Sequence, residues 1–188
     1  MQLQLTRLDA RRYETLITRS DGVSFRVKGV GHMAAIPHDL AHFAVERGLG
    51  LHRGFWGSVA AGAVFASLEH VGGRRRPHAA ERSRALLKEN QGDLTETEIL
   101  VGLFNQALEE GLAPDSPELR RRLKRYVWTA PGHAPRQFSD AEISAVCAAW
   151  HDMHARWTTL PIGGTMALAW PERNDQERRT SAGRKPVR

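Results

Sequence analysis

The chain has 188 residues, of which 41% are hydrophobic, and it carries a formal net charge of +6 and a single cysteine, Cys147. This length is typical of one domain with a sizeable core, one cysteine excludes a disulfide framework, and the longest apolar stretch, residues 55–68, is too short to span a membrane. We therefore expect a soluble cytoplasmic protein without a membrane partner, whose positive charge favours contact with anions.

Three strands are predicted at the start of the chain. In residues 1–8, apolar and polar side chains alternate, which is the period expected of a half-buried strand. Residues 13–30 indicate two more strands joined at Asp21-Gly22, a dipeptide typical of tight hairpin turns in which both central residues have positive φ. The N-terminal part of the chain is therefore expected to form an antiparallel sheet.

Helices are predicted over the middle of the chain. Pro37 suits a first helical position, where its missing N–H is not needed. Thr95 with Glu98, and Ser139 with Glu142, fit the capping box, in which each side chain accepts a hydrogen bond from the other residue's backbone N–H. The predicted helical ranges are 36–47, 55–70, 79–90, 95–110, 116–127 and 139–157.

A last strand is predicted at residues 163–171, and a lone strand must find a partner for its backbone groups, so it should return to the N-terminal sheet. Strands grouped before a run of helices favour an α+β fold. We expect one α+β domain over residues 1–171, in which a small antiparallel sheet of the three N-terminal strands and the C-terminal strand packs against a layer of about five helices. Residues 172–188 are basic and are predicted to be a disordered tail.

The stretch IPHDLAHFAVE, residues 36–46, concentrates residues that can bind a metal or move a proton. On a helix, His38, Asp39, His42 and Glu46 fall on one stripe, and the apolar residues mostly face away. Residues four apart bring their Cβ atoms within ~6 Å, so the two imidazoles can reach one ion. We predict His38, His42 and Glu46 as ligands of a divalent metal, with zinc favoured.

The spacing H-D-x-x-H resembles the H-E-x-x-H helix of the zincins, a family of zinc metallohydrolases. The resemblance implies that His38 and His42 bind zinc and that Asp39 activates the bound water, although aspartate is one methylene shorter than glutamate. It names no third ligand, so Glu46 competes with three others: His52, Glu69 and His70. The wider block of residues 30–65 resembles a group of uncharacterised small bacterial proteins, and this implies no activity.

Two other interpretations of these histidines remain open. Asp39 would stabilise an ordinary helix start through the helix dipole, with the histidines as caps. Alternatively, His151 and His154 lie with Cys147 on one side of the predicted helix 139–157, and could complete an inter-helical metal site if that helix crosses the first. The same helix also has an ordinary core face, with Cys147 and His154 at its edge.

Basic residues are dense in the predicted helix 116–127. If this helix followed helix 95–110 in a helix-turn-helix arrangement, its cations would contact nucleic-acid phosphates, although the link between the two helices is longer than usual. The alternative is a solvated basic face. The candidate anion-binding residues are Arg120, Arg121, Arg122, Lys124 and Arg125. No nucleotide-binding glycine loop is present in the sequence.

Three classes of function follow from these patterns. The first is a metal-binding protein or a metal-dependent hydrolase that uses the histidine stretch. The second is a non-enzymatic binding or regulatory protein that contacts an acidic partner or nucleic acid through its arginine clusters. The third is a structural protein in which the histidine stretch only begins a helix.

Overall fold

The computed structural model describes residues 1–30, 36–113 and 116–171. They form an antiparallel sheet in the order β4-β3-β2-β1-β7 and a separate pair, β5-β6. The strands are β1 (Gln2–Arg7), β2 (Arg12–Thr18), β3 (Ser24–Val30), β4 (Glu69–Gly72), β5 (Val127–Trp128), β6 (Arg136–Gln137) and β7 (Thr165–Ala169). The helices are α1 (His38–Leu49), α2 (Phe55–Ala61), α3 (Ala79–Glu89), α4 (Gln91–Glu109), α5 (Pro117–Arg125) and α6 (Asp140–Thr159).

The α+β prediction is confirmed, including the return of the C-terminal strand to the N-terminal sheet, where β7 pairs with β1. Alternation along the strands creates the buried face, because every second side chain points the same way. Leu3 stands opposite Ile17 on β2 and Leu168 on β7, and all three are buried. Such cross-strand apolar pairs stabilise the sheet and set its register.

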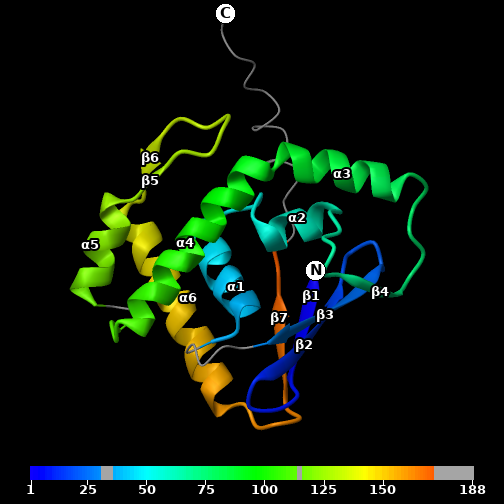
Figure 1. Cartoon of the computed structure of the whole chain (residues 1–188), viewed down its shortest axis with the longest axis horizontal. Helices are drawn as coiled ribbons and strands as arrows, with labels where there is room; N and C mark the ends of the chain where they lie inside the picture. The colour runs from blue at the N-terminus through cyan, green and yellow to red at the C-terminus, as the bar shows by residue number, and fades with distance from the viewer. Residues whose placement is uncertain (31–35, 114–115, 172–188) are drawn as a thin grey trace, which may run out of the picture.

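Helix α1 lies at the centre of the molecule, with contacts to α2, α4 and α6 (Figure 1). Its buried residues run almost all the way round the helix, as expected of a helix covered on several sides. They are Leu40, Ala41, His42, Phe43, Ala44, Val45, Glu46 and Leu49. Two of these are polar, and both belong to the stripe that the sequence singled out.

The turn at Asp21-Gly22 forms, but the prediction of positive φ at both residues is wrong. Gly22 has φ 79°, and among the described non-glycine residues only His78 has a positive φ. The Gly22 N–H donates to the Arg19 carbonyl and the Arg19 N–H donates to the Val23 carbonyl. These bonds fit a three-residue hairpin loop, in which only the last residue needs a positive φ. Gly22 occupies that position, so Asp21 keeps a negative φ.

The second predicted helix is shorter than expected. It ends at Ala61, where Gly62 adopts φ 116° and closes the helix, instead of continuing to residue 70. Residues 69–72 form β4, which pairs with the outer edge of β3. The outer edge of β3 offers unpaired backbone N–H and C=O groups. Pairing with them stabilises residues 69–72 as a strand more than their weak helical pattern stabilises a helix. The small β5-β6 hairpin was also not predicted.

One of the two predicted capping boxes is present. Ser139 and Glu142 bond reciprocally at the start of α6. The prediction of a Thr95–Glu98 capping box is wrong, because α4 begins at Gln91 and Thr95 lies in the second turn of the helix. The Thr95 hydroxyl donates instead to the Gln91 carbonyl at 3.0 Å. Glu98 is therefore available for contacts with another helix.

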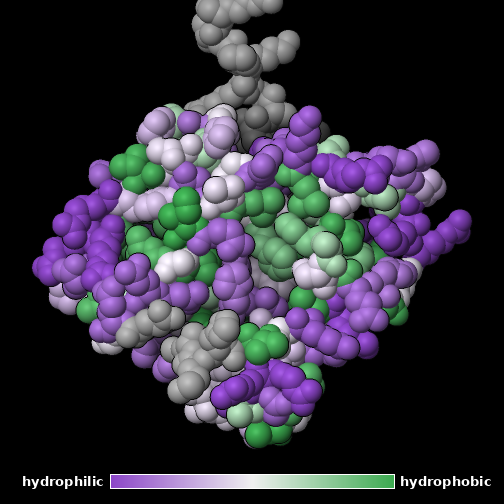
Figure 2. All heavy atoms as spheres, in the orientation of Figure 1, coloured by the Kyte–Doolittle hydropathy of each residue, from purple (hydrophilic) through white to green (hydrophobic). Residues whose placement is uncertain are grey.

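In the described part of the chain, no helix is both long enough and apolar enough to cross a membrane. Figure 2 shows hydrophilic residues over α5 and around α3, with apolar residues between them over α2. Phe55, the first residue of α2, and Phe65 are half-buried, and their rings, with centroids 4.7 Å apart, pack against the core. The predicted basic tail, 172–188, lies outside the described residues.

Helices α1 and α6 approach so closely at Gly48 that a side chain does not fit. A Cβ at this position would lie 2.4 Å from the Val146 Cα. We expect Gly48→Ala to lower the free energy of unfolding by about 1–3 kcal/mol, because the two backbones must separate, even though alanine is the better helix former. Chemical denaturation measures this change.

Gly102→Ala on α4 is the matched control. Nothing lies within 4 Å of a Cβ at Gly102, so this change should be neutral or stabilising by up to ~1 kcal/mol. Equal stability of the two variants would contradict the close contact between α1 and α6.

Candidate metal centre

Three side chains that can bind metals meet where α1 packs against α4. His38, His42 and Glu98 each offer a ligand atom, and these atoms lie within 4.8 Å of one another. The Nε2 of His42 is 3.2 Å from one Glu98 oxygen, and the Nε2 of His38 is 3.7 Å from the other. Within the described ranges, no other group of three or more such residues meets this criterion.

The helix geometry explains this meeting. His38 and His42 are one turn apart on α1, so their rings lie together, with centroids 4.6 Å apart. Glu98 reaches them from α4 because it lies inside that helix and not at its start. The cluster is open on one side: the His42 side chain is 3% exposed, whereas those of His38 and Glu98 are 54% and 58% exposed.

Beneath the cluster, the Glu46 carboxylate orients His42. Glu46 has no exposed surface, and its Oε1 is 3.1 Å from the Nδ1 of His42. Its oxygens also accept hydrogen bonds from the backbone N–H groups of Phe55 at 2.8 Å, Trp56 at 2.9 Å and Gly57 at 3.3 Å, in the first turn of α2. Anions are stabilised at a helix N-terminus, both by these donors and by the helix dipole.

Four donors occupy the lone pairs of Glu46. A carboxylate offers about four acceptor sites, and three of the donors here are backbone N–H groups that cannot accept a proton in return. Burial raises the pKa of the Glu46 carboxyl, and hydrogen bonds from His42, Gly57 and Phe55 oppose this shift. A Cβ at Gly54 would lie 2.5 Å from the Glu46 Cδ, so the glycine makes room for this carboxylate.

The two carboxylates determine the charge of His42. Burial alone lowers the pKa of its imidazole, but Glu46 and Glu98 together outweigh burial and raise the pKa to about 9. The pKa of His38 is lowered by partial burial and by the neighbouring His42. When the Nδ1–H of His42 donates to Glu46, its Nε2 faces Glu98, and this nitrogen can carry either a proton or a metal ion.

Asp39, the predicted base, is directed elsewhere. Its carboxylate accepts a hydrogen bond from the Thr15 hydroxyl on β2 at 3.1 Å and interacts with Tyr13. Burial raises the pKa of the Asp39 carboxyl. Its backbone carbonyl accepts from the Trp56 indole at 2.9 Å. Asp39 therefore connects α1 to the sheet and to α2, and it is not part of the three-residue cluster.

The other predicted ligands do not join the cluster either. His151 is exposed and His154 half-buried on α6, and among the described residues neither belongs to a metal-ligating group. Glu46 lies behind His42, and four donors occupy its carboxylate oxygens. The carboxylate that lies beside both histidines is that of Glu98, where the sequence had predicted Glu46. The sequence analysis missed Glu98 because a capping-box pattern accounted for it, and only the contact between α1 and α4 shows its role.

The basic residues of α5 bond to other residues of the chain. Arg121 lies 2.6 Å from Glu118, Arg122 lies 2.6 Å from Glu110, and Lys124 lies 2.7 Å from Asp140. Two contacts complete the set: Arg125 with Glu118 at 3.9 Å and Arg120 with the Ser144 hydroxyl at 3.0 Å. A nucleic acid would have to compete with these partners, most of which are acidic.

Comparison of the chain with protein-family models, with curated proteins and with solved structures finds no match. The chemistry of the His38, His42 and Glu98 cluster therefore rests on its own geometry.

The contacts of Glu46 predict a large effect on stability. In Glu46→Gln, an amide NH2 would face backbone N–H donors, leaving buried groups unpaired, so we expect a loss of about 1–3 kcal/mol in the free energy of unfolding. Glu98→Gln, at the exposed side of the cluster, should change stability by less than ~1 kcal/mol. Denaturant unfolding in the presence of a chelator compares the two, and a smaller effect at Glu46 would contradict this assignment.

Proposed function

We propose that the protein binds a divalent metal ion, preferentially zinc, through His38, His42 and Glu98. The observation that carries the proposal is the hydrogen bond from His42 Nδ1 to the buried Glu46 carboxylate. Metal-binding histidines usually donate their second ring nitrogen to a carboxylate or carbonyl, because this sets the tautomer and orients the ring. His42 has this partner on one side and two further ligands on the other.

The distances are compatible with one ion after small side-chain movements. Ligands about 2.0–2.1 Å from a tetrahedral zinc lie ~3.3 Å apart. The 3.2 Å between His42 and Glu98 already fits, whereas the largest separation, within 4.8 Å, must shorten. The half-exposed side chains of His38 and Glu98 can rotate to close it, while His42 is held by Glu46.

Two imidazoles and one carboxylate are the ligand set of a catalytic zinc site more often than of a structural one. Three protein ligands leave a fourth position for water, and the exposed side of the cluster would admit it. A metal-dependent hydrolase is therefore the extension of this proposal. Asp39 is a poor candidate for its base, since the Asp39 carboxylate bonds to Thr15 on the sheet side.

Metal content tests the proposal directly. We expect purified untagged protein to carry near-stoichiometric zinc or another divalent metal, and His38→Ala/His42→Ala to lose it. The His151→Ala/His154→Ala variant removes two histidines from α6 and is the matched control, which should retain the metal. Elemental analysis after dialysis against added zinc gives the result. Absence of metal from the wild type, or equal metal in both variants, would overturn the proposal.

The role of Glu46 gives a second expectation. Glu46→Gln should weaken zinc affinity by about 10–100-fold, because the partner that orients His42 is lost while all three ligands remain. Asp39→Asn should leave the affinity unchanged. Competition with a chromophoric chelator, at a temperature where both variants are folded, measures these affinities. Unchanged affinity in Glu46→Gln would show that His42 is not oriented through this bond.

A further inference from the structure

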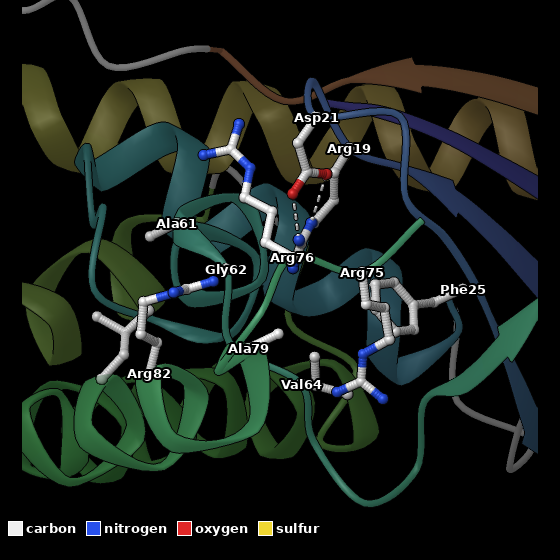
Figure 3. A pocket seen from close by; sticks show the side chains of 11 residues that line it. Arg19, Asp21, Phe25, Ala61, Gly62, Val64, Arg75, Arg76, Ala79 and Arg82 are labelled. Atoms are coloured by element: carbon white, nitrogen blue, oxygen red, sulfur yellow. Dashed lines mark hydrogen bonds and ion pairs between the residues drawn. The ribbon is translucent and has the colours of Figure 1, made fainter. Parts of the chain in front are cut away.

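A second candidate site lies away from the histidine cluster, in a cavity of about 140 Å³ (Figure 3). Its wall is built by the β2-β3 turn, the segment after α2, the loop between β4 and α3, and one face of α3. Four arginines line it, and none of the proposed metal ligands does. They are Arg19, Arg75, Arg76 and Arg82.

The positive charge of this cavity is largely unmatched. Asp21 is the acidic residue in its lining, and it binds Arg19 in a two-point contact with distances of 3.1 Å and 2.5 Å. Hydrogen bonds from Arg19, together with the Val23 N–H and the positive charges of Arg19 and Arg76, lower the pKa of the Asp21 carboxyl, so it stays ionised. Within residues 1–30, 36–113 and 116–171, the structure has no ion pair that involves Arg75, Arg76 or Arg82.

Arg19 supplies a buried donor without an acceptor. Its side chain is only 10% exposed, and its guanidinium carbon lies 5.4 Å from the centre of the Phe25 ring. Asp21 takes the hydrogen bonds of Nε and Nη2, whereas the buried Nη1 has no hydrogen-bond partner. Buried polar groups in native proteins are almost always paired, so an unpaired charged donor in a cavity wall indicates a missing acceptor.

We propose that this cavity binds the phosphoryl group of a small molecule. Guanidinium groups present planar donors that match phosphate oxygens, and a dianion would balance the excess positive charge. Figure 3 shows the guanidinium groups of Arg19 and Arg82 reaching the cavity from opposite walls. Ala79, the first residue of α3, also lines the cavity, and this helix start has no side-chain cap.

The remaining wall determines what can be attached to the phosphoryl group. Ala61, Val64 and Leu86 are apolar and line the same cavity. They would accept a small hydrocarbon substituent and leave a sugar hydroxyl without partners. The ligand class is therefore a phosphomonoester with a compact apolar group, and free inorganic phosphate shares the chemistry of its charged end.

Binding is measured by calorimetry with inorganic phosphate and with phenyl phosphate, at constant ionic strength set by sodium chloride. We expect both to bind at millimolar or lower concentration, with phenyl phosphate tighter. Arg82→Gln removes a side chain with no ion pair in the described residues and should weaken both by about tenfold. Arg19→Gln should have a similar effect, and it also removes the contact with Asp21.

Arg84→Gln is the matched control: it removes the same charge from the same helix at an exposed position that does not line the cavity. It should bind as the wild type does. Tighter binding of phenyl phosphate supports an ester ligand, and equal binding supports free phosphate as the source. No binding, or equal weakening by Arg82→Gln and Arg84→Gln, would overturn the proposal.

Two further arms separate this site from other sources of affinity. His38→Ala should leave phosphate binding unchanged. If this variant lost phosphate binding, the anion would lie at the histidine cluster, and the proposed cavity site would be refuted. The affinity for 5′-phosphorylated oligonucleotides of increasing length tests for general attraction of polyanions. An affinity that rises with length by the same amount in the wild type and in Arg82→Gln would also refute the cavity site.

Discussion

The hydrogen bonds of Glu46 join the parts of this protein that matter most for its candidate chemistry. A carboxylate with no exposed surface is stable only when donors surround it, and Glu46 has four. Three of them are the first backbone N–H groups of α2, so α1 and α2 are held in one orientation. The fourth is the ring N–H of His42, so the same carboxylate fixes how the imidazole faces the cluster at the surface.

The other contacts of α1 follow the same plan. Asp39 bonds to Thr15 on β2, and His42 meets Glu98 on α4. At Gly48 the helix touches the backbone of α6. Each of these contacts joins the helix to a different neighbour, and a satisfied polar network of this kind specifies a single arrangement of the elements around it. The histidine-rich helix is thus both the centre of the fold and the carrier of the candidate metal site.

Charge is distributed differently from what the density of arginines indicates. Helix α5 is the most basic stretch of the described structure, yet its cations bond to acids and a hydroxyl of the same chain. By contrast, Arg75 and Arg76 in the loop before α3 and Arg82 on α3 have no ion pair within the described residues, and they line one cavity with the buried Arg19. A count of charges along a sequence therefore says little about where an anion would bind, because neighbouring acids decide how much of that charge is available.

The sequence by itself determined the elements whose signals are local. Alternating strands predicted the sheet face and the C-terminal strand, the Ser139–Glu142 pair predicted the start of α6, and the four-residue spacing brought His38 and His42 together. Periodicity and capping depend on residues close in the chain, so they can be read there. The same local rule failed at Thr95, since a helix interior can contain the pattern of a helix start.

Only the tertiary structure decided which side chains meet across elements. It brought Glu98 to the histidines, placed Glu46 behind His42, directed Asp39 to the sheet and gathered Arg19 with arginines far along the chain. The physical reason is that a helical stripe specifies a direction from its own axis but not what lies in that direction. The crossing of α4 over α1, and the depth at which each polar group is buried, depend on packing of the whole core.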